Sequence, residues 1–281
     1  MRNLVAIFLF VAVIVNLNAA GAKVPELKPD KQIIYKKTPQ GDLKLHVFFP
    51  PNYKQKKKFP AMILFFGGGW IGGKAALFYP HCRYFADRGM VCIAPEYRIR
   101  STHKTSPLEA VSDAKSAMRW IKKHHSDLKV DTNRLVAGGS SAGGHLAAAT
   151  AFVNAYDDPK DDLKISPCPN ALVLFCPVID NGPDGYGYKR IKDEYKKFSP
   201  MHNISKSSGK CPDTIFILGK RDHLIPLATA KKFKKEIESK KAECQLVVYP
   251  KAGHGSFYSG KYYQLAIKEV ENFLKKHKFI K

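Results

Sequence analysis

The feature that most constrains the fold of this chain is a series of short apolar segments separated by helical patterns. Nearly every position in these segments is apolar, as in strands that are covered on both faces. They lie at residues 62–66, 90–94, 135–137, 171–176, 214–218 and 246–249. Apolar residues at helical spacing occur between and after them, at residues 107–123, 145–153, 227–240 and 262–276. This alternation predicts a parallel sheet with helices on both faces.

Two earlier segments, residues 33–37 and 43–49, alternate between apolar and polar side chains and predict an antiparallel hairpin at one edge. With them, the mostly parallel sheet has eight strands. The irregular stretch 180–213 is rich in Gly, Pro, Lys and Tyr and is too short for a domain, so we interpret it as an insertion that forms a pocket wall or a lid. A chain of 281 residues that is 44% hydrophobic has room for one large core.

The first 22 residues have the pattern of a signal peptide. Arg2 supplies a positive charge, residues 4–15 are all apolar, and Ala20-Gly21-Ala22 offers small residues for cleavage. The apolar run would span only about 18 Å as a helix, against about 30 Å for the hydrocarbon core of a membrane. We therefore predict a signal peptide over residues 1–22, a single folded domain over residues 23–281, a secreted or periplasmic location and no stable membrane insertion.

The chain is strongly basic, with a formal net charge of +23, and the predicted cleavage removes only Arg2. Lysines outnumber arginines by 38 to nine, whereas proteins that read nucleic acids favour arginine, so we expect no nucleic-acid partner. The lysines indicate a solvated surface, with attraction to an acidic polymer outside the cell as the alternative. Charge alone does not separate these two interpretations.

Six cysteines follow the predicted cleavage point at irregular spacing. Cys92 and Cys176 lie within strand-like segments, which indicates buried thiols, while Cys168 and Cys211 lie in loops and could pair. No CxxC or HExxH spacing occurs, so we expect no metal site.

The most specific motif is Gly139-Ser140-Ser141-Ala142-Gly143, which matches G-x-S-x-G between a predicted strand and a predicted helix. A nucleophile on such a sharp turn needs small residues two positions away on either side, so that its hydroxyl stands clear of the backbone. The N-terminus of the following helix also directs N–H groups at the reacting carbonyl. These features identify Ser141 as the predicted nucleophile, while Ser140 has Ala142 at the position where the motif requires glycine.

A second glycine-rich segment, Gly67-Gly68-Gly69-Trp70, directly follows the strand at residues 62–66. Glycines allow the backbone to turn its N–H groups toward an oxyanion at close range. We therefore predict an oxyanion hole formed by the N–H groups of Gly68, Gly69 and Ala142.

The partners of Ser141 should follow it in the order Asp or Glu, then His. Asp222 comes after the strand at 214–218, and His254 comes after the strand at 246–249, between two glycines. Both positions are at the carboxyl ends of parallel strands, where an open α/β sheet collects its ligands. We predict His254 as the general base and Asp222 as the residue that orients it, with Asp180 as the alternative acid.

Residues 61–257 resemble the hormone-sensitive-lipase-like and acetyl-xylan-esterase-like α/β-hydrolases. The segments that carry the resemblance are Gly67-Gly68-Gly69-Trp70, Pro95-Glu96-Tyr97-Arg98, Asp131-Thr132-Asn133-Arg134, the run from Gly139 to Ala148, Asp222-His223-Leu224-Ile225-Pro226 and Gly253-His254-Gly255. The resemblance implies the α/β-hydrolase fold and hydrolysis of carboxylic esters through an acyl-serine, with no cofactor. In this family a His usually precedes the three glycines, where this chain has Phe66, and the lipase-like members carry a helical cap before their first strands that we expect to be missing here.

A site without a cap suits a bulky or polymeric ester. We therefore expect a secreted serine esterase that removes acetyl or other short acyl groups from carbohydrate, with a general short-chain carboxylesterase or a lipase as the alternative. A peptidase similar to the prolyl oligopeptidase domain, a binding protein that keeps the triad and a basic polymer-binding module are further alternatives. Trp70 and Phe257 are the candidate substrate-binding residues, although Trp70 and Tyr97 fit packing roles at least as well.

Overall fold

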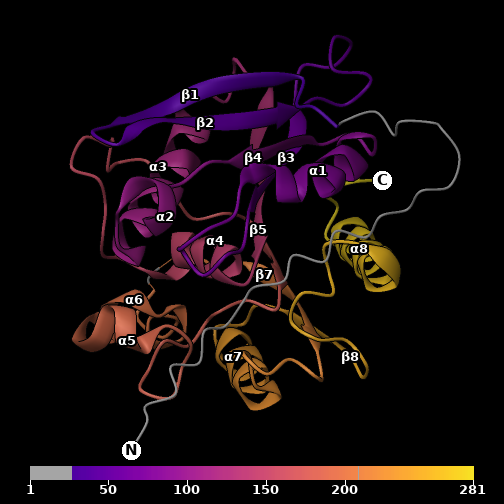
Figure 1. The fold of residues 1–281 in the computed structure, drawn as a ribbon. Helices are drawn as coiled ribbons and strands as arrows, with labels where there is room; N and C mark the ends of the chain where they lie inside the picture. Colours follow the sequence, from indigo (N-terminus) through magenta and orange to yellow (C-terminus); the bar gives the residue numbers. More distant parts are fainter. Residues whose placement is uncertain (1–26, 208) are drawn as a thin grey trace, which may run out of the picture.

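An eight-stranded sheet forms the centre of the computed structural model, which describes residues 27–207 and 209–281 (Figure 1). Its spatial order is β1-β2-β4-β3-β5-β6-β7-β8. The strands are β1 (Lys31–Thr38), β2 (Gly41–Phe48), β3 (Phe59–Phe65), β4 (Val91–Pro95), β5 (Val130–Ser140), β6 (Ala171–Phe175), β7 (Asp213–Gly219) and β8 (Cys244–Tyr249). β2 pairs antiparallel with both β1 and β4, and all other neighbours are parallel.

Helices cover both faces of this sheet (Figure 1). On one face α1 (Tyr79–Ala86) packs beside α8 (Gly260–Lys276), where the Tyr84 hydroxyl donates to Glu271. On the other face are α3 (Pro107–Lys123), α4 (Ala142–Phe152) and α7 (Leu227–Ser239), and Phe152 of α4 meets Phe233 of α7 edge to face. The arrangement confirms the α/β-hydrolase fold that the sequence predicts.

The remaining helices are short. α2 (Arg100–His103) follows β4, and η1 (Ala75–Phe78), a 3₁₀ turn, precedes α1. The stretch 180–213 contains α5 (Tyr188–Ile191), η2 (Lys192–Glu194), α6 (Tyr195–Phe198) and η3 (Pro200–His202). This insertion covers α4, because the Phe198 ring of α6 stacks on the His145 ring of α4 at 4.2 Å. That cover explains why every residue of α4 except Ala151 is buried, since the helix is enclosed between the sheet and the insertion.

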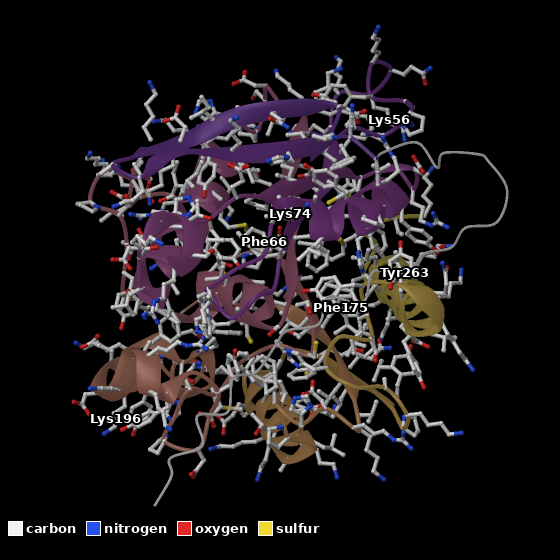
Figure 2. The ribbon with its side chains drawn as sticks, in the orientation of Figure 1. Lys56, Phe66, Lys74, Phe175, Lys196 and Tyr263 are labelled. Atoms are coloured by element: carbon white, nitrogen blue, oxygen red, sulfur yellow. The ribbon has the colours of Figure 1, made fainter. Side chains whose placement is uncertain are left out.

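The core fills the spaces between the sheet and its helices. All seven residues of β3 and all five of β4 and of β6 are buried. Figure 2 shows Phe66 and Phe175 in the interior, and lysines such as Lys56 and Lys196 with their side chains pointing outward. Burial on both faces explains why these strands have no alternation of polar and apolar residues.

Three details differ from the sequence predictions. β5 begins at Val130, five residues before the predicted strand, because the polar residues 131–134 continue the strand at the rim of the sheet. α4 begins at Ala142 and not at residue 145, since Gly143 and Gly144 are helical despite their low helix propensity. Helix α1 was not predicted from the sequence.

Cys168 and Cys211 do not form the disulfide that the sequence allowed, and all six cysteines are free thiols. Cys92 and Cys176 are buried, as expected. The predicted signal peptide, residues 1–22, lies outside the described residues. Among the residues that are described, no helix is long and apolar enough to cross a membrane.

A buried cluster of charges fastens the β1–β2 hairpin to the helical layer. Asp113 on α3 is fully buried, and its Oδ1 lies 2.8 Å from both Lys36 Nζ of β1 and Arg98 Nη2. Arg98 also donates its Nε–H to Asp113 Oδ2 at 2.8 Å. Because the carboxylate is out of contact with water, these two cations and the Arg98 backbone N–H, which donates to Asp113 Oδ2 at 3.0 Å, supply its stabilisation.

We expect Asp113→Ala to lower the free energy of unfolding by about 3 kcal/mol, because it leaves the mostly buried Arg98 without a carboxylate and leaves Lys36 with Asp158 alone. Urea denaturation measures the change. Glu238→Ala is the control, since it removes an exposed ion pair with Lys234 and should cost less than about 0.5 kcal/mol. Equal losses in the two variants would show that the Asp113 cluster does not stabilise the fold.

Candidate active site

The turn between β5 and α4 holds Ser141 in a backbone conformation that side chains other than glycine rarely adopt. Its φ is 56° and its ψ is −121°, which costs on the order of 1–3 kcal/mol. The turn is also tightly packed, because a Cβ on Gly143 would lie 2.0 Å from the Phe65 carbonyl oxygen and one on Gly139 would lie 2.5 Å from the same atom. Only glycine fits at these two positions, and their close packing holds the Ser141 backbone in place.

His254 joins Ser141 to Asp222. Its Nε2 lies 2.8 Å from Ser141 Oγ, and its Nδ1 lies 2.8 Å from Asp222 Oδ2. Asp222 is itself held in place, because its Oδ1 accepts the N–H groups of Leu224 at 2.8 Å and Ile225 at 2.9 Å. The structure therefore brings together the three residues that the sequence singled out, from the ends of β5, β7 and β8.

The surroundings of Asp222 and His254 shift their two pKa values in opposite directions. Burial on its own raises the pKa of the Asp222 carboxyl, but the hydrogen bonds from His254 and from the two backbone N–H groups hold that pKa below its ordinary value. Burial lowers the pKa of His254, yet the Asp222 carboxylate and the adjacent Cys176 sulfur outweigh it and raise that pKa above its ordinary value. A charged Asp222 requires the proton of neutral His254 on Nδ1, which leaves Nε2 free to accept the Ser141 proton.

The glycine loop after β3 passes beside the nucleophile. A Cβ on Gly67 would lie 3.3 Å from the Ser141 Cβ, and Gly68 and Gly69 have φ values of +131° and +62°. The Gly67 N–H donates to the Tyr258 hydroxyl at 3.2 Å and is therefore occupied. Within the described part of the chain, the N–H groups of Gly68 and Gly69 donate to no other residue, and that of Ala142 lies in the first turn of α4, where no intrahelical acceptor exists.

Phe66 occupies the place where the family usually has His, and two tyrosines hold the loop there. The Phe66 ring stacks on the Tyr97 ring at 4.1 Å, and the Tyr97 hydroxyl donates to the Phe66 carbonyl at 2.7 Å. Tyr258 holds the next residue through Gly67. Stacking and two hydrogen bonds thus fix the loop without an imidazole.

Trp70 and Phe257 are packing residues in this structure. Trp70 is 2% exposed and meets His145 edge to face at 5.1 Å, and Phe257 is 2% exposed and lies 6.4 Å from the Phe175 ring. Trp70 does line a cavity beside the glycine loop, and contact of either side chain with substrate stays a prediction. The alternative acid, Asp180, is bonded to the Gly182 N–H, and its carboxylate lies 3.8 Å from His202, away from His254.

Three residues of the site were missed from the sequence. Tyr258 braces Gly67, the Cys176 thiol donates to the His254 carbonyl at 3.0 Å, and Arg190 Nη1 donates to the Gly69 carbonyl at 2.7 Å. Cys176 could have been found by its place at the carboxyl end of β6, whereas no pattern marks the other two. Cys176, Asp222 and His254 also form a group of possible metal ligands in the described residues, but the hydrogen bonds of the triad occupy both ring nitrogens of His254.

Two family models match consecutive parts of the chain. The model described as BD-FAE matches residues 45–171, which include Ser141, and that of the Dienelactone hydrolase family matches residues 186–276, which include Asp222 and His254. Each half of the candidate site therefore falls within a match.

The chain is also similar to esterases. An esterase from the Planctomycetes species Thermogutta terrifontis is 36% identical, with a TM-score of 0.84 over 91% of this chain and 95% of that chain. Its propionate-bound and butyrate-bound structures, both 36% identical over 91% of this chain and 97% of that one, have TM-scores of 0.83 and 0.84. Esterase LipC of Mycobacterium tuberculosis is 24% identical over 221 residues, 70% of this chain and 53% of LipC. The chain spans about half the length of the curated relatives it matches.

We expect the acid limb of the kcat/KM profile to lie above pH 6.5, the ordinary pKa of His, because His254 acts as a base only when it is neutral and its pKa is raised. Asp222→Asn removes the charge that raises this pKa, so the limb should move to lower pH while kcat falls by about 10⁴. Rates of ester hydrolysis measured between about pH 5 and pH 10 test both effects. A limb that stays in place in the variant would contradict the assignment of Asp222 as the partner of His254.

Proposed function

This chain belongs to the α/β-hydrolase serine esterases, and we propose that it hydrolyses short-chain carboxylic esters through an acyl-enzyme on Ser141. The observation that carries the proposal is the position of His254, whose two ring nitrogens lie 2.8 Å from Ser141 Oγ and 2.8 Å from Asp222 Oδ2. A serine hydroxyl is a weak nucleophile until an adjacent base takes its proton, and His254 is in place to do so.

In the first half of the proposed reaction, Ser141 Oγ attacks the ester carbonyl carbon while its proton passes to His254 Nε2. The carbonyl oxygen becomes an oxyanion that accepts the N–H groups of Gly68, Gly69 and Ala142, and each such donor contributes on the order of 10²–10³ in kcat. His254 then protonates the alcohol oxygen as its bond to carbon breaks, which leaves the acyl group on Ser141.

In the second half, His254 takes a proton from a water molecule that attacks the acyl carbon. The same N–H groups stabilise the second oxyanion, and the proton returns to Ser141 Oγ as the carboxylic acid departs. Asp222 keeps its charge in both halves, which agrees with its lowered pKa. Its negative charge stabilises the His254 cation that forms in each half.

Similarity supports a short acyl group, because the structures of the Thermogutta terrifontis esterase include propionate-bound and butyrate-bound forms. For the alcohol, we propose a carbohydrate hydroxyl. This part of the proposal depends on the predicted export, because the motifs around Ser141 and His254 resemble lipase-like and acetyl-xylan-esterase-like proteins alike. We also propose hydrolysis outside the cytoplasm, on the basis of the apolar run at residues 4–15, and this location would give the enzyme access to polymers.

The catalytic proposal is tested with p-nitrophenyl esters of increasing acyl length. We expect wild type to prefer acyl chains of about four carbons or fewer, and Ser141→Ala to lose about 10⁶ in kcat. Ser239→Ala is the control, because it removes an exposed serine hydroxyl at the end of α7 that bonds only to the Glu236 carbonyl among the described residues, and it should leave the activity unchanged. Hydrolysis by Ser141→Ala at the wild-type rate would refute the proposed nucleophile, and a strong preference for long chains would indicate a lipase.

The proposed export is tested by expressing the whole chain in a bacterial host and sequencing the N-terminus of the protein from the periplasm or medium. We expect cleavage after Ala20 or Ala22, because these small residues follow the apolar run. Replacing Leu9 with Lys interrupts that run and should retain the protein in the cytoplasm. If the unmutated protein stayed uncleaved in the cytoplasm of the host, the prediction would be contradicted.

A further inference from the structure

A basic cavity of ≈ 570 Å³ opens beside the glycine loop, and the proposed reaction makes no use of it. Four of its ten lining residues are cations, and none is Asp or Glu. The four cations are Arg100, Lys104, Lys189 and Arg190.

Two separate segments build this cavity against the glycine loop. On the α2 side, the Arg100 N–H donates to the Trp70 carbonyl and the Ser101 N–H to the Ile71 carbonyl, both at 2.9 Å. On the insertion side, the Arg190 guanidinium donates to the Gly69 carbonyl. Figure 1 shows α2 and α5 on the same side of the molecule as α4, at whose N-terminus Ser141 lies. The cavity is therefore fixed to the same loop that carries the proposed oxyanion donors.

The positive charges around the cavity are not neutralised by the protein. Among the described residues, Arg100, Lys104, Lys189 and Arg190 form no ion pair with a carboxylate. The nearby Glu109 carboxylate accepts hydrogen bonds from the Ser106 N–H and hydroxyl and is paired with none of these four cations. In addition, the Thr105 hydroxyl oxygen is buried without a hydrogen-bond partner, an arrangement that costs free energy unless a bound group satisfies it.

A second cavity, which is also lined in part by the insertion, has the opposite character. It measures ≈ 310 Å³, and its lining includes Asp180 and Asp184 together with His202 and His223. The first cavity is thus lined by cations without carboxylates, and the second by carboxylates without lysine or arginine. An anionic part of a substrate would be attracted to the side of Gly69 and Arg190 and repelled from the side of Asp180.

We propose that the basic cavity binds a carboxylate of the substrate, so that the enzyme prefers short acyl esters of acidic saccharides over those of neutral ones. Guanidinium groups such as that of Arg100 match the two oxygens of a carboxylate, and the lysines add charge. This inference rests on the proposed ester hydrolysis, and it specifies the alcohol part of the ester as an acidic saccharide. It also gives the basic net charge a role in attracting an acidic polymer.

The test compares two forms of one probe, an O-acetylated oligogalacturonate with free carboxylates and the same oligomer with its carboxylates methyl-esterified. Released acetate is measured for both, at low salt. We expect wild type to favour the free acid by about tenfold in kcat/KM, with the difference in KM. Raising the ionic strength from about 0.01 M to about 1 M shortens the Debye length from about 30 Å to about 3 Å and should reduce the preference.

Arg100→Gln/Lys189→Gln removes two cations of the cavity and leaves Arg190 on the loop. We expect this variant to lose most of the preference for the free acid, because each exposed charge pair contributes up to about fivefold. The neutral probe has no carboxylate to pair with these cations, so its hydrolysis should stay within about twofold of wild type. Lys196→Gln/Lys206→Gln is the matched control. It removes the same charge from exposed lysines outside the cavity, the first of which is labelled in Figure 2, and should keep the preference.

Equal rates on the two probes in wild type would overturn the carboxylate site while leaving the esterase assignment in place. The same would follow if the control variant lost the preference as fully as the cavity variant, because the effect would then be one of net charge. If wild type hydrolysed p-nitrophenyl acetate but neither saccharide, acidic saccharides would be excluded as substrates. Failure on p-nitrophenyl acetate as well would refute the proposed function itself.

Discussion

The close contact between the end of β3 and the turn around Ser141 is the constraint on which the rest of the site depends. The Phe65 carbonyl lies where a Cβ of Gly143 or Gly139 would be, so the loop after β3 and the turn after β5 are packed backbone to backbone. This packing holds Ser141 at a φ of 56° and brings Gly67 alongside it. Nucleophile and oxyanion donors are consequently placed by one contact between two neighbouring parallel strands, β3 and β5.

The other groups of the site are fastened to this contact from several directions. Tyr97 and Tyr258 hold the loop from the sheet side and from the His254 segment, and Arg190 holds it from the insertion. Cys176 ties the backbone of His254 to the end of β6. Each bond joins segments that are far apart in the sequence, so the geometry of the site depends on the whole fold and not on one loop. Such support is what preorganised donors require, because a small displacement costs much of the electrostatic stabilisation.

The parts of this molecule that were predictable from sequence are those in which local chemistry determines position. The sequence itself shows the strands that are buried on both faces, the glycines around Ser141, and Asp222 and His254 in the expected order. These patterns predict the fold and the triad. The rest depends on contacts between distant segments. Nothing near Arg190 in the sequence indicates that it reaches Gly69, and the free thiols of Cys168 and Cys211 follow from how two loops lie in space. The burial of Trp70 was likewise not predictable from its neighbours in the sequence, because Tyr186 and Phe198 of the distant insertion pack on it.

Arg190 joins the basic cavity to the catalytic loop by a hydrogen bond. Arg190 donates to the Gly69 carbonyl while it lines the cavity, so a carboxylate bound there would meet a guanidinium that is already held in place. Less conformational freedom is then lost on binding than for a free lysine. The same guanidinium holds the loop that carries the proposed oxyanion donors, because it donates to the Gly69 carbonyl. One side chain therefore serves both the wall of the cavity and the support of the loop.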